Sequence, residues 1–315
     1  MTLVAAAFRR PSPPCSVNLF PSTMMEAQAN TSRISRRFAE LGQAGEMGIV
    51  AYLTAGDPSF DATRQFVLAM AEAGADVIEL GVPFSDPLAD GPTIQRAFER
   101  ALKNGATLAG VIHLVREVRN SNSAANEVPI VLFSYYNPIF QMGLEKFAAT
   151  AASAGADGVL VTDITPEESE DYRRIMIAHH LDTVFLGAPT STDERLAKIA
   201  ACSSGFLYLI SRTGVTGAKD TLPDDLPALL RRARSATQLP IAVGFGISLP
   251  GHVSVLGGLA NAAVVGSALV SEIEKASANG SSQASIDEAA TAIAERIRSF
   301  KSAARAGLSR REVAT

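Results

Sequence analysis

The segment VIELGVPFSDPLADGP, residues 77–92, joins a strand-like run to a loop rich in glycine and proline, and each part carries one candidate carboxylate. Residues 77–82 are apolar or glycine except for Glu79, which predicts a strand buried on both faces, as in a parallel sheet. Burial disfavours the charged form of a carboxyl group, so we expect a raised pKa for Glu79. Asp90, in the loop, is expected to stay ionised. Two carboxylates in unlike surroundings indicate an acid/base site with divided roles. An ion-paired structural Glu79 and a helix-capping Asp90 would explain the same residues.

Composition narrows the class of protein around this segment. The chain has 315 residues, 47% of them hydrophobic, which suits either two ordinary domains or one α/β barrel of about 250 residues. A net charge of -4 without a basic run predicts no binding to nucleic acid or to a membrane surface. No apolar run approaches the roughly 18 residues that a transmembrane helix needs. Cys15 and Cys202 lack a metal-ligand spacing to any histidine, so we expect no metal site.

Residues 1–30 form a leader that we expect to lie outside the fold. Its first 23 residues contain Arg9 and Arg10, several serines and prolines, and no acid. One interpretation is an organelle transit peptide, which would place the protein in a plastid. We favour the other interpretation, in which Met24 or Met25 is the true start and the protein is cytoplasmic.

Eight short apolar runs alternate with stretches of helical length from residue 49 onward. The runs are residues 49–54, 77–82, 130–135, 158–162, 183–187, 206–210, 241–245 and 262–266. Helical periodicity between them is clearest in residues 62–73, 167–179, 193–202 and 224–236. This alternation, without a break in composition, predicts a single TIM (β/α)8 barrel over residues 31–275. A doubly wound sheet is the alternative.

Three further features belong to the same prediction. Residues 32–41 indicate an extra N-terminal helix before the first strand. Residues 276–315 comprise a small, polar connection over 276–285 and a C-terminal helix over 286–300. The sequence Ala-Gly-Ala-Asp occurs at residues 73–76 and at 154–157, each time before a strand, and Gly74 and Gly155 suit the left-handed residue that ends a helix.

The reactive groups of such a barrel lie at the C-terminal ends of its strands. Asp57, Asp163 and Tyr208 fall near this face, although Asp57-Pro58 could simply start a turn. The glycine-containing segment 211–217 suits a lid over bound substrate. Glycines at 244, 246 and 266 follow the last two strands, where this barrel class binds phosphate, so we expect a small phosphorylated substrate. Tight packing at barrel corners is the alternative explanation for these glycines.

Several other mechanisms lack their sequence signals. The four histidines lie in helical or solvated positions. There is no Gly-x-Gly-x-x-Gly after the first strand, no Walker loop, and no lysine at a strand end for a Schiff base. A proton-transfer mechanism without a cofactor remains.

Five motifs in order resemble the tryptophan synthase alpha subunit family, and the resemblance covers residues 32–272. They are ELGVPFSDPLADGP at 79–92, LTAGDP at 53–58, YYNP at 135–138, SRTGVTG at 211–217 and GFGIS at 244–248. The resemblance implies a TIM barrel that cleaves indole-3-glycerol phosphate to indole and glyceraldehyde 3-phosphate, a retro-aldol reaction catalysed by a carbon-carbon lyase.

The resemblance also implies a role for each matching residue. Glu79 would be the general acid/base, and Asp90 would hold the indole N–H and stabilise developing positive charge. Thr216, in the closing loop, would contact the aspartate. Phosphate would be held at Gly217, Gly246, Gly266 and Ser267, while Tyr208 would lie beside the catalytic glutamate and Tyr52 would form a wall of the indole pocket.

The family works as an α2β2 complex in which indole passes to a beta subunit that carries pyridoxal phosphate. The resemblance therefore implies a beta-subunit partner, an interface near residues 85–88, and no cofactor in this chain. Two alternatives remain open: a free-standing indole-3-glycerol-phosphate lyase, and a catalytically silent phosphate-binding regulatory subunit. Retention of both Glu79 and Asp90 argues against the silent subunit.

Overall fold

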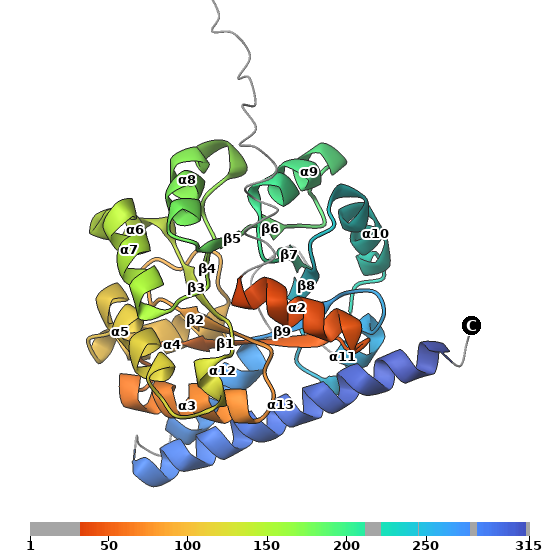
Figure 1. Cartoon of the computed structure of the whole chain (residues 1–315). Helices are drawn as coiled ribbons and strands as arrows, with labels where there is room; N and C mark the ends of the chain where they lie inside the picture. The colour runs from red at the N-terminus through yellow and green to blue at the C-terminus, as the bar shows by residue number, and fades with distance from the viewer. Residues whose placement is uncertain (1–31, 212–221, 245, 278–281, 313–315) are drawn as a thin grey trace, which may run out of the picture.

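The computed structural model describes residues 32–211, 222–244, 246–277 and 282–312, so the expected leader over residues 1–30 lies outside the described ranges. Within them, nine parallel strands form one sheet in the order β5-β4-β3-β2-β1-β9-β8-β7-β6. The two end strands, β5 (Asp182–Val184) and β6 (Leu186–Gly187), are consecutive in the chain, so the sheet curls into a nearly closed barrel (Figure 1). The TIM barrel is confirmed.

The ninth strand arises because the fifth predicted strand, residues 183–187, is split at Phe185. The Phe185 N–H donates to Oγ of Ser203 at 3.3 Å, and its ring packs edge-on against Tyr172 outside the barrel. The backbone ladder is therefore interrupted at this residue. The other strands match their predictions closely and are β1 (Gly48–Thr54), β2 (Val77–Gly81), β3 (Ile130–Ser134), β4 (Gly158–Val161), β7 (Leu207–Ile210), β8 (Ile241–Gly244) and β9 (Ala262–Val265).

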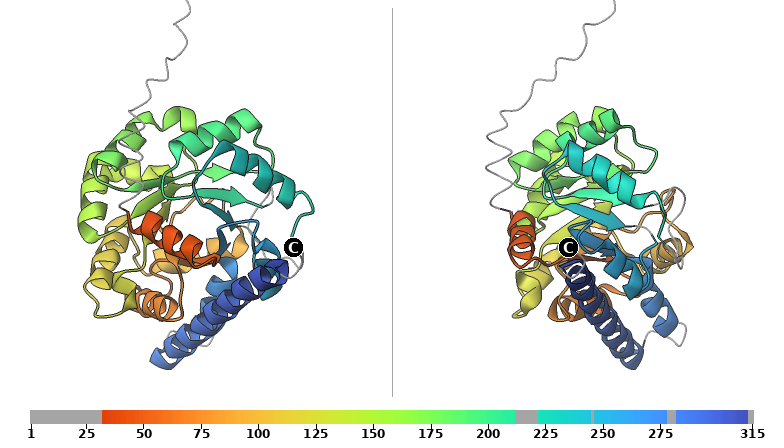
Figure 2. Two further views of the ribbon diagram at one scale, coloured as in Figure 1. Left: turned by 45° about the vertical axis from the view of Figure 1, so that its right-hand side comes forward. Right: turned by 90° about the vertical axis from the view of Figure 1, so that its right-hand side faces the viewer.

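Helices surround the strands in every view (Figure 2). They are α2 (Arg33–Gln43), α3 (Phe60–Glu72), α4 (Pro92–Lys103), α5 (Leu108–Arg119), α6 (Tyr136–Met142), α7 (Leu144–Ala154), α8 (Glu170–Ala178), α9 (Asp193–Cys202), α10 (Leu226–Ala236), α11 (Pro250–Leu256), α12 (Ser267–Ser277) and α13 (Gln283–Glu312), with short 3-10 turns η1 (Ala124–Asn126) and η2 (Pro166–Glu168). None of these helices is long and apolar enough to span a membrane.

The helix α2 is the expected extra N-terminal helix, and it closes one end of the barrel. Ser32 caps it by accepting the Ser35 N–H. Ile34, Phe38 and Leu41 are buried and join the apolar cluster that fills the barrel interior. A larger apolar cluster lies between the strands and the outer helices. The barrel therefore has two cores, and α2 completes the inner one.

The repeated Ala-Gly-Ala-Asp segment ties strands to their neighbours. Gly74 and Gly155 both have φ of 96°, as expected for the left-handed residue after a helix. The aspartate of each repeat then accepts a backbone N–H from a neighbouring strand, Ile49 to Asp76 at 2.6 Å and Ile130 to Asp157 at 2.7 Å.

The same two aspartates anchor α2. Arg37 donates to Asp76 at 2.6 Å and Arg33 donates to Asp157 at 2.9 Å. The two arginines are one helical turn apart, so they project from one face of α2. The helix that fills the end of the barrel is thus held by an ion pair to each copy of the repeat.

The C-terminal helix is longer than its prediction over residues 286–300 and packs on the barrel. It contacts α3, α11 and α12, which places it in the outer ring between α3 and α11 (Figure 1). The predicted connection over residues 276–285 is helical at both ends, because α12 ends at Ser277 and α13 begins at Gln283. The boundary expected at residue 275 falls within α12, which packs on α13.

Candidate active site

Glu79 lies in the middle of β2 and is completely buried. It is in register with Tyr52 of β1 and Val131 of β3, whose side chains belong to the interior core. Neither of its carboxylate oxygens has a hydrogen-bond partner within the described part of the chain. Burial raises the pKa of Glu79 to about 8, which agrees with the direction expected from the sequence.

Asp90 lies in the loop that connects β2 to α4. Its Oδ2 accepts a hydrogen bond from the Tyr135 hydroxyl at 2.7 Å, and the same hydroxyl oxygen accepts the Ala89 N–H at 2.9 Å. Although it lies in a loop, Asp90 is only 4% exposed. Burial raises its pKa to about 6, and the Tyr135 bond limits the rise. The two carboxyl groups still differ in protonation at neutral pH, where Asp90 is largely ionised and Glu79 is largely protonated.

Tyr52 and Tyr208 lie close to this pair. Both side chains are buried, and burial followed by the charges of Glu79 and Asp90 raises the pKa of both hydroxyls. The structure therefore brings together four of the residues expected in the site. Tyr52 also packs edge-on against Phe133, with ring centroids 5.3 Å apart.

Each tyrosine lies over a glycine of the next strand. A Cβ built on Gly81 would be 2.6 Å from Cζ of Tyr52, and one built on Gly244 would be 2.6 Å from Cζ of Tyr208. In both cases the glycine stands two residues beyond the register partner of the tyrosine. Only a residue without a side chain fits there, so both glycines shape the site.

The expected phosphate-binding residues cluster at the ends of β8 and β9. Gly246 has φ of 83°, a left-handed conformation that favours glycine. Gly266 follows β9, and Ser267 begins α12. The first N–H groups of a helix have no partner within it, and the helix dipole favours an anion there. The chemistry suits a phosphate group. Thr216 and Gly217 lie outside the described residues.

Comparison with known proteins adds an independent observation at this point. The family model "Tryptophan synthase alpha chain" matches residues 38–304. The chain belongs to the tryptophan synthase alpha chain family.

Relatives and solved structures agree with this assignment. The tryptophan synthase alpha chain of Solibacter usitatus is 52% identical over 244 residues, which cover 78% of this chain and 90% of the relative. That of Chloroflexus aurantiacus is 47% identical and covers 78% of this chain and 91% of the relative. Tryptophan synthase subunit alpha from Legionella pneumophila superposes with a TM-score of 0.76 at 33% identity, covering 87% of this chain and 99% of that one. A chain of Mycobacterium tuberculosis tryptophan synthase gives 0.77 at 31% identity, covering 87% and 98%.

Membership in the tryptophan synthase alpha chain family makes this chain a lyase of tryptophan biosynthesis. The family resemblance expected from the sequence is confirmed. Family membership does not assign roles to single residues. The structure describes the surroundings of several expected site residues and gives structural contacts for two others.

Two aspartates near the site have structural contacts. Asp57 is completely buried and pairs through both oxygens with Arg100, at 2.8 Å each. Asp163 accepts the Tyr136 N–H at 2.7 Å, at the start of α6. Neither aspartate is a better acid/base candidate than Glu79.

Tyr135 was not among the expected site residues, although its motif was noted. It ends the apolar run of the third strand, at the same barrel face as the other groups. The position of its hydroxyl at the end of a strand was the signal in the sequence that could have identified Tyr135 as a site residue. Among the described residues, no group of three or more histidine, cysteine, aspartate or glutamate side chains is arranged to hold a metal ion.

Proposed function

We propose how the residues of this site divide the alpha-chain reaction, the retro-aldol cleavage of indole-3-glycerol phosphate to indole and glyceraldehyde 3-phosphate. Glu79 acts as the general acid and base, and Asp90 binds the indole N–H. The observation that carries the proposal is the environment of Glu79. It is a fully buried carboxyl group with no hydrogen-bond partner among the described residues and a pKa of about 8. A group poised near working pH both gives and takes a proton.

The proton transfers follow from these protonation states. Protonated Glu79 donates its proton to C3 of the indole ring, which leaves a positive charge on the ring system. Ionised Asp90 accepts a hydrogen bond from the ring N–H and stabilises that charge. Glu79, now ionised, takes the proton of the glycerol hydroxyl as the carbon-carbon bond breaks. The electron pair of that bond returns to the indole ring. Glu79 ends the cycle protonated.

The substrate phosphate is proposed to bind at the start of α12. The backbone of Gly246 and Gly266 and the hydroxyl of Ser267 supply donors, with Gly217 contributing from the loop after β7, while Thr216 of the same loop contacts Asp90. Left-handed Gly246 and the N-terminus of an 11-residue helix support this assignment. The indole ring then lies between Tyr52 and Tyr208.

The partner is proposed to be a beta subunit in an α2β2 complex, and pyridoxal phosphate is assigned to that subunit. Leu88, in the expected interface segment 85–88, is 90% exposed, and Phe140 on α6 is 61% exposed. Large apolar groups in open positions favour a protein interface. The relatives named above are bacterial, which supports a cytoplasmic location over a plastid.

Substitution of Glu79 by glutamine tests the catalytic assignment. We expect Glu79→Gln to lower indole production from indole-3-glycerol phosphate by at least about a thousandfold, because glutamine transfers no proton. Glu72→Gln, an exposed position on α3, is the matched control and should leave the rate unchanged. Indole production at the wild-type rate by Glu79→Gln would refute the mechanism.

Addition of a beta subunit separates the remaining functions. An alpha subunit cleaves substrate slowly alone and much faster with its partner. A free-standing lyase shows no binding and no acceleration. A silent regulatory subunit shows no cleavage under either condition, although it binds the phosphate ligand.

A further inference from the structure

Arg100 lies at the centre of an ionic network that joins the loop after β1 to the helices α4 and α12. Its Nε and Nη2 donate to both oxygens of Asp57 at 2.8 Å, and its Nη1 donates to Glu274 at 3.2 Å. Glu274 also accepts two bonds from Arg96, at 2.5 and 2.9 Å. Arg96 and Arg100 are one turn apart on α4, so one face of that helix serves both carboxylates.

Each carboxylate belongs to a different part of the candidate site. Asp57 follows β1, the strand that carries Tyr52, and Glu274 lies on α12, which begins at Ser267. The helix α4 itself begins at Pro92, two residues after Asp90. Arg100 therefore joins the loop after β1, the Asp90 segment and the helix of the proposed phosphate site.

The network is partly shielded from solvent. The Asp57 side chain is completely buried, and those of Arg100 and Glu274 are 23% and 30% exposed. A two-point contact between guanidinium and carboxylate is directional as well as strong. The two-point contact of Arg100 with Asp57 holds α4 on the loop after β1. The two-point contact of Arg96 with Glu274 and the single bond from Arg100 hold α12 on α4, whereas apolar contact alone is non-directional.

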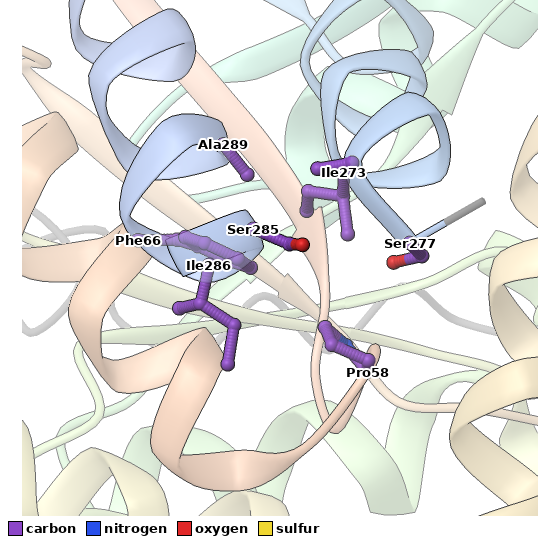
Figure 3. A pocket seen from close by; sticks show the side chains of 8 residues that line it. Pro58, Phe66, Ile273, Ser277, Ser285, Ile286 and Ala289 are labelled. Carbon is purple, nitrogen blue, oxygen red and sulfur yellow. The ribbon is translucent and has the colours of Figure 1, made fainter. Parts of the chain in front are cut away.

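The other contacts at this end of α12 are mainly apolar. Figure 3 shows Ile273 and Ser277 facing Pro58, with Phe66 of α3 and Ile286 of α13 beside them. These residues line a cavity of about 10 Å³, which holds at most one water molecule and no ligand. Apolar packing of this kind is non-directional, and the bonds to Glu274 add directional contacts to it.

We propose that Arg100 is a positioning residue that sets the distance between the phosphate site at the start of α12 and the carboxyl pair, acting through Glu274 and Asp57. The inference rests on the proposed binding of phosphate at Ser267. Displacement of a bound reactant by about 1 Å can cost a hundredfold in rate, so a shift of α12 should reach the chemistry.

The test compares two substrates, indole-3-glycerol phosphate and the same molecule without phosphate, indole-3-glycerol. Glu274→Gln removes the charge that joins α12 to α4 and keeps the buried Arg100–Asp57 pair. We expect its kcat/KM for the phosphorylated substrate to fall about tenfold and that for indole-3-glycerol to stay unchanged. The substrate ratio, which is kcat/KM for the phosphorylated substrate divided by kcat/KM for indole-3-glycerol, therefore falls about tenfold.

Three further variants sharpen the comparison. Glu272→Gln, on the same helix, loses ion pairs to Lys275 and to Arg296 of α13 instead, and should keep the wild-type ratio. Arg100→Lys keeps the charge without the two-point contact and should give an intermediate ratio. Arg96→Gln removes an exposed partner of Glu274 and provides the readout if Glu274→Gln fails to fold.

The outcomes are distinct. An unchanged substrate ratio in Glu274→Gln, or in Arg96→Gln where that variant is needed, overturns the positioning role. An equal loss on both substrates assigns the network to general stability and also overturns it. Wild-type protein that cleaves neither substrate refutes the proposed function, and equal wild-type rates on both refute the phosphate site.

Discussion

Tyr135 donates a hydrogen bond from its hydroxyl to Oδ2 of Asp90, and the two oxygens lie 2.7 Å apart. The bond favours the ionised carboxylate and holds the pKa of Asp90 below the value that burial alone would produce. Tyr135 is not expected to contact the substrate, but it favours the ionised form of Asp90, which is expected to bind the indole N–H.

The Tyr135→Phe variant should shift the pH dependence of the reaction. Loss of the bond raises the pKa of Asp90 above about 6, so the acidic limb of kcat/KM moves to higher pH, by roughly one unit. Activity at pH 6.5 should fall more than activity at pH 8. A limb that stays in place would contradict this role. Tyr136→Phe, one residue along, is the matched control.

Glu79 should make the folded protein less stable as pH rises. Its pKa is about 8 in the folded chain against an ordinary value of 4.5, so between these values the folded state binds the proton more tightly than the unfolded state. The wild-type free energy of unfolding therefore falls relative to that of Glu79→Gln, by up to roughly 1.4 kcal/mol per pH unit. Below pH 4.5 the difference should be constant. Urea unfolding from pH 4 to 9 measures it, and a flat difference throughout would show that Glu79 ionises normally.

Asp157 should be important for stability and not for chemistry. It pairs with Arg119 at 2.6 Å and with Arg33 at 2.9 Å, and the Arg119 side chain is only 8% exposed. Asp157→Asn leaves that arginine without its charge partner, so we expect a loss of about 3 kcal/mol in the free energy of unfolding. Asp171→Asn breaks a pair that is largely exposed and should change little. Urea denaturation of the two variants makes the comparison, and equal stability would contradict the anchoring of α2.

Gly244→Ala should damage the site directly. The new methyl group would overlap the Tyr208 ring, with 2.6 Å to Cζ, and displace it from its position in the site. We expect kcat/KM to fall at least about tenfold, with a loss of roughly 1–3 kcal/mol in stability from overpacking. Gly251→Ala, where nothing lies within 4 Å of the added Cβ, should behave like wild type. Normal kinetics in Gly244→Ala would show that Tyr208 moves freely.

Local patterns were sufficient for the strands, the extra helix and the burial of Glu79. Strand burial and helical periodicity are properties of neighbouring residues, so short windows of sequence contain them. The break at Phe185 was not predictable in this way, because it depends on a bond to Ser203, 18 residues away. The burial of Asp90 was missed for the same reason, since Tyr135 lies 45 residues along the chain.

The sequence by itself determined the barrel class and the family, and it singled out Glu79 and Asp90 as candidate acid/base residues. Periodic burial and an ordered set of motifs are properties of the linear sequence. Only the tertiary structure decided that Asp90 is buried under Tyr135 and that α13 joins the outer ring. It also decided that Arg100 joins Asp57, 43 residues away, to Glu274, 174 residues away. Such contacts depend on how the strands and helices are arranged in space, and the charge or hydroxyl of a single residue does not identify its distant partner.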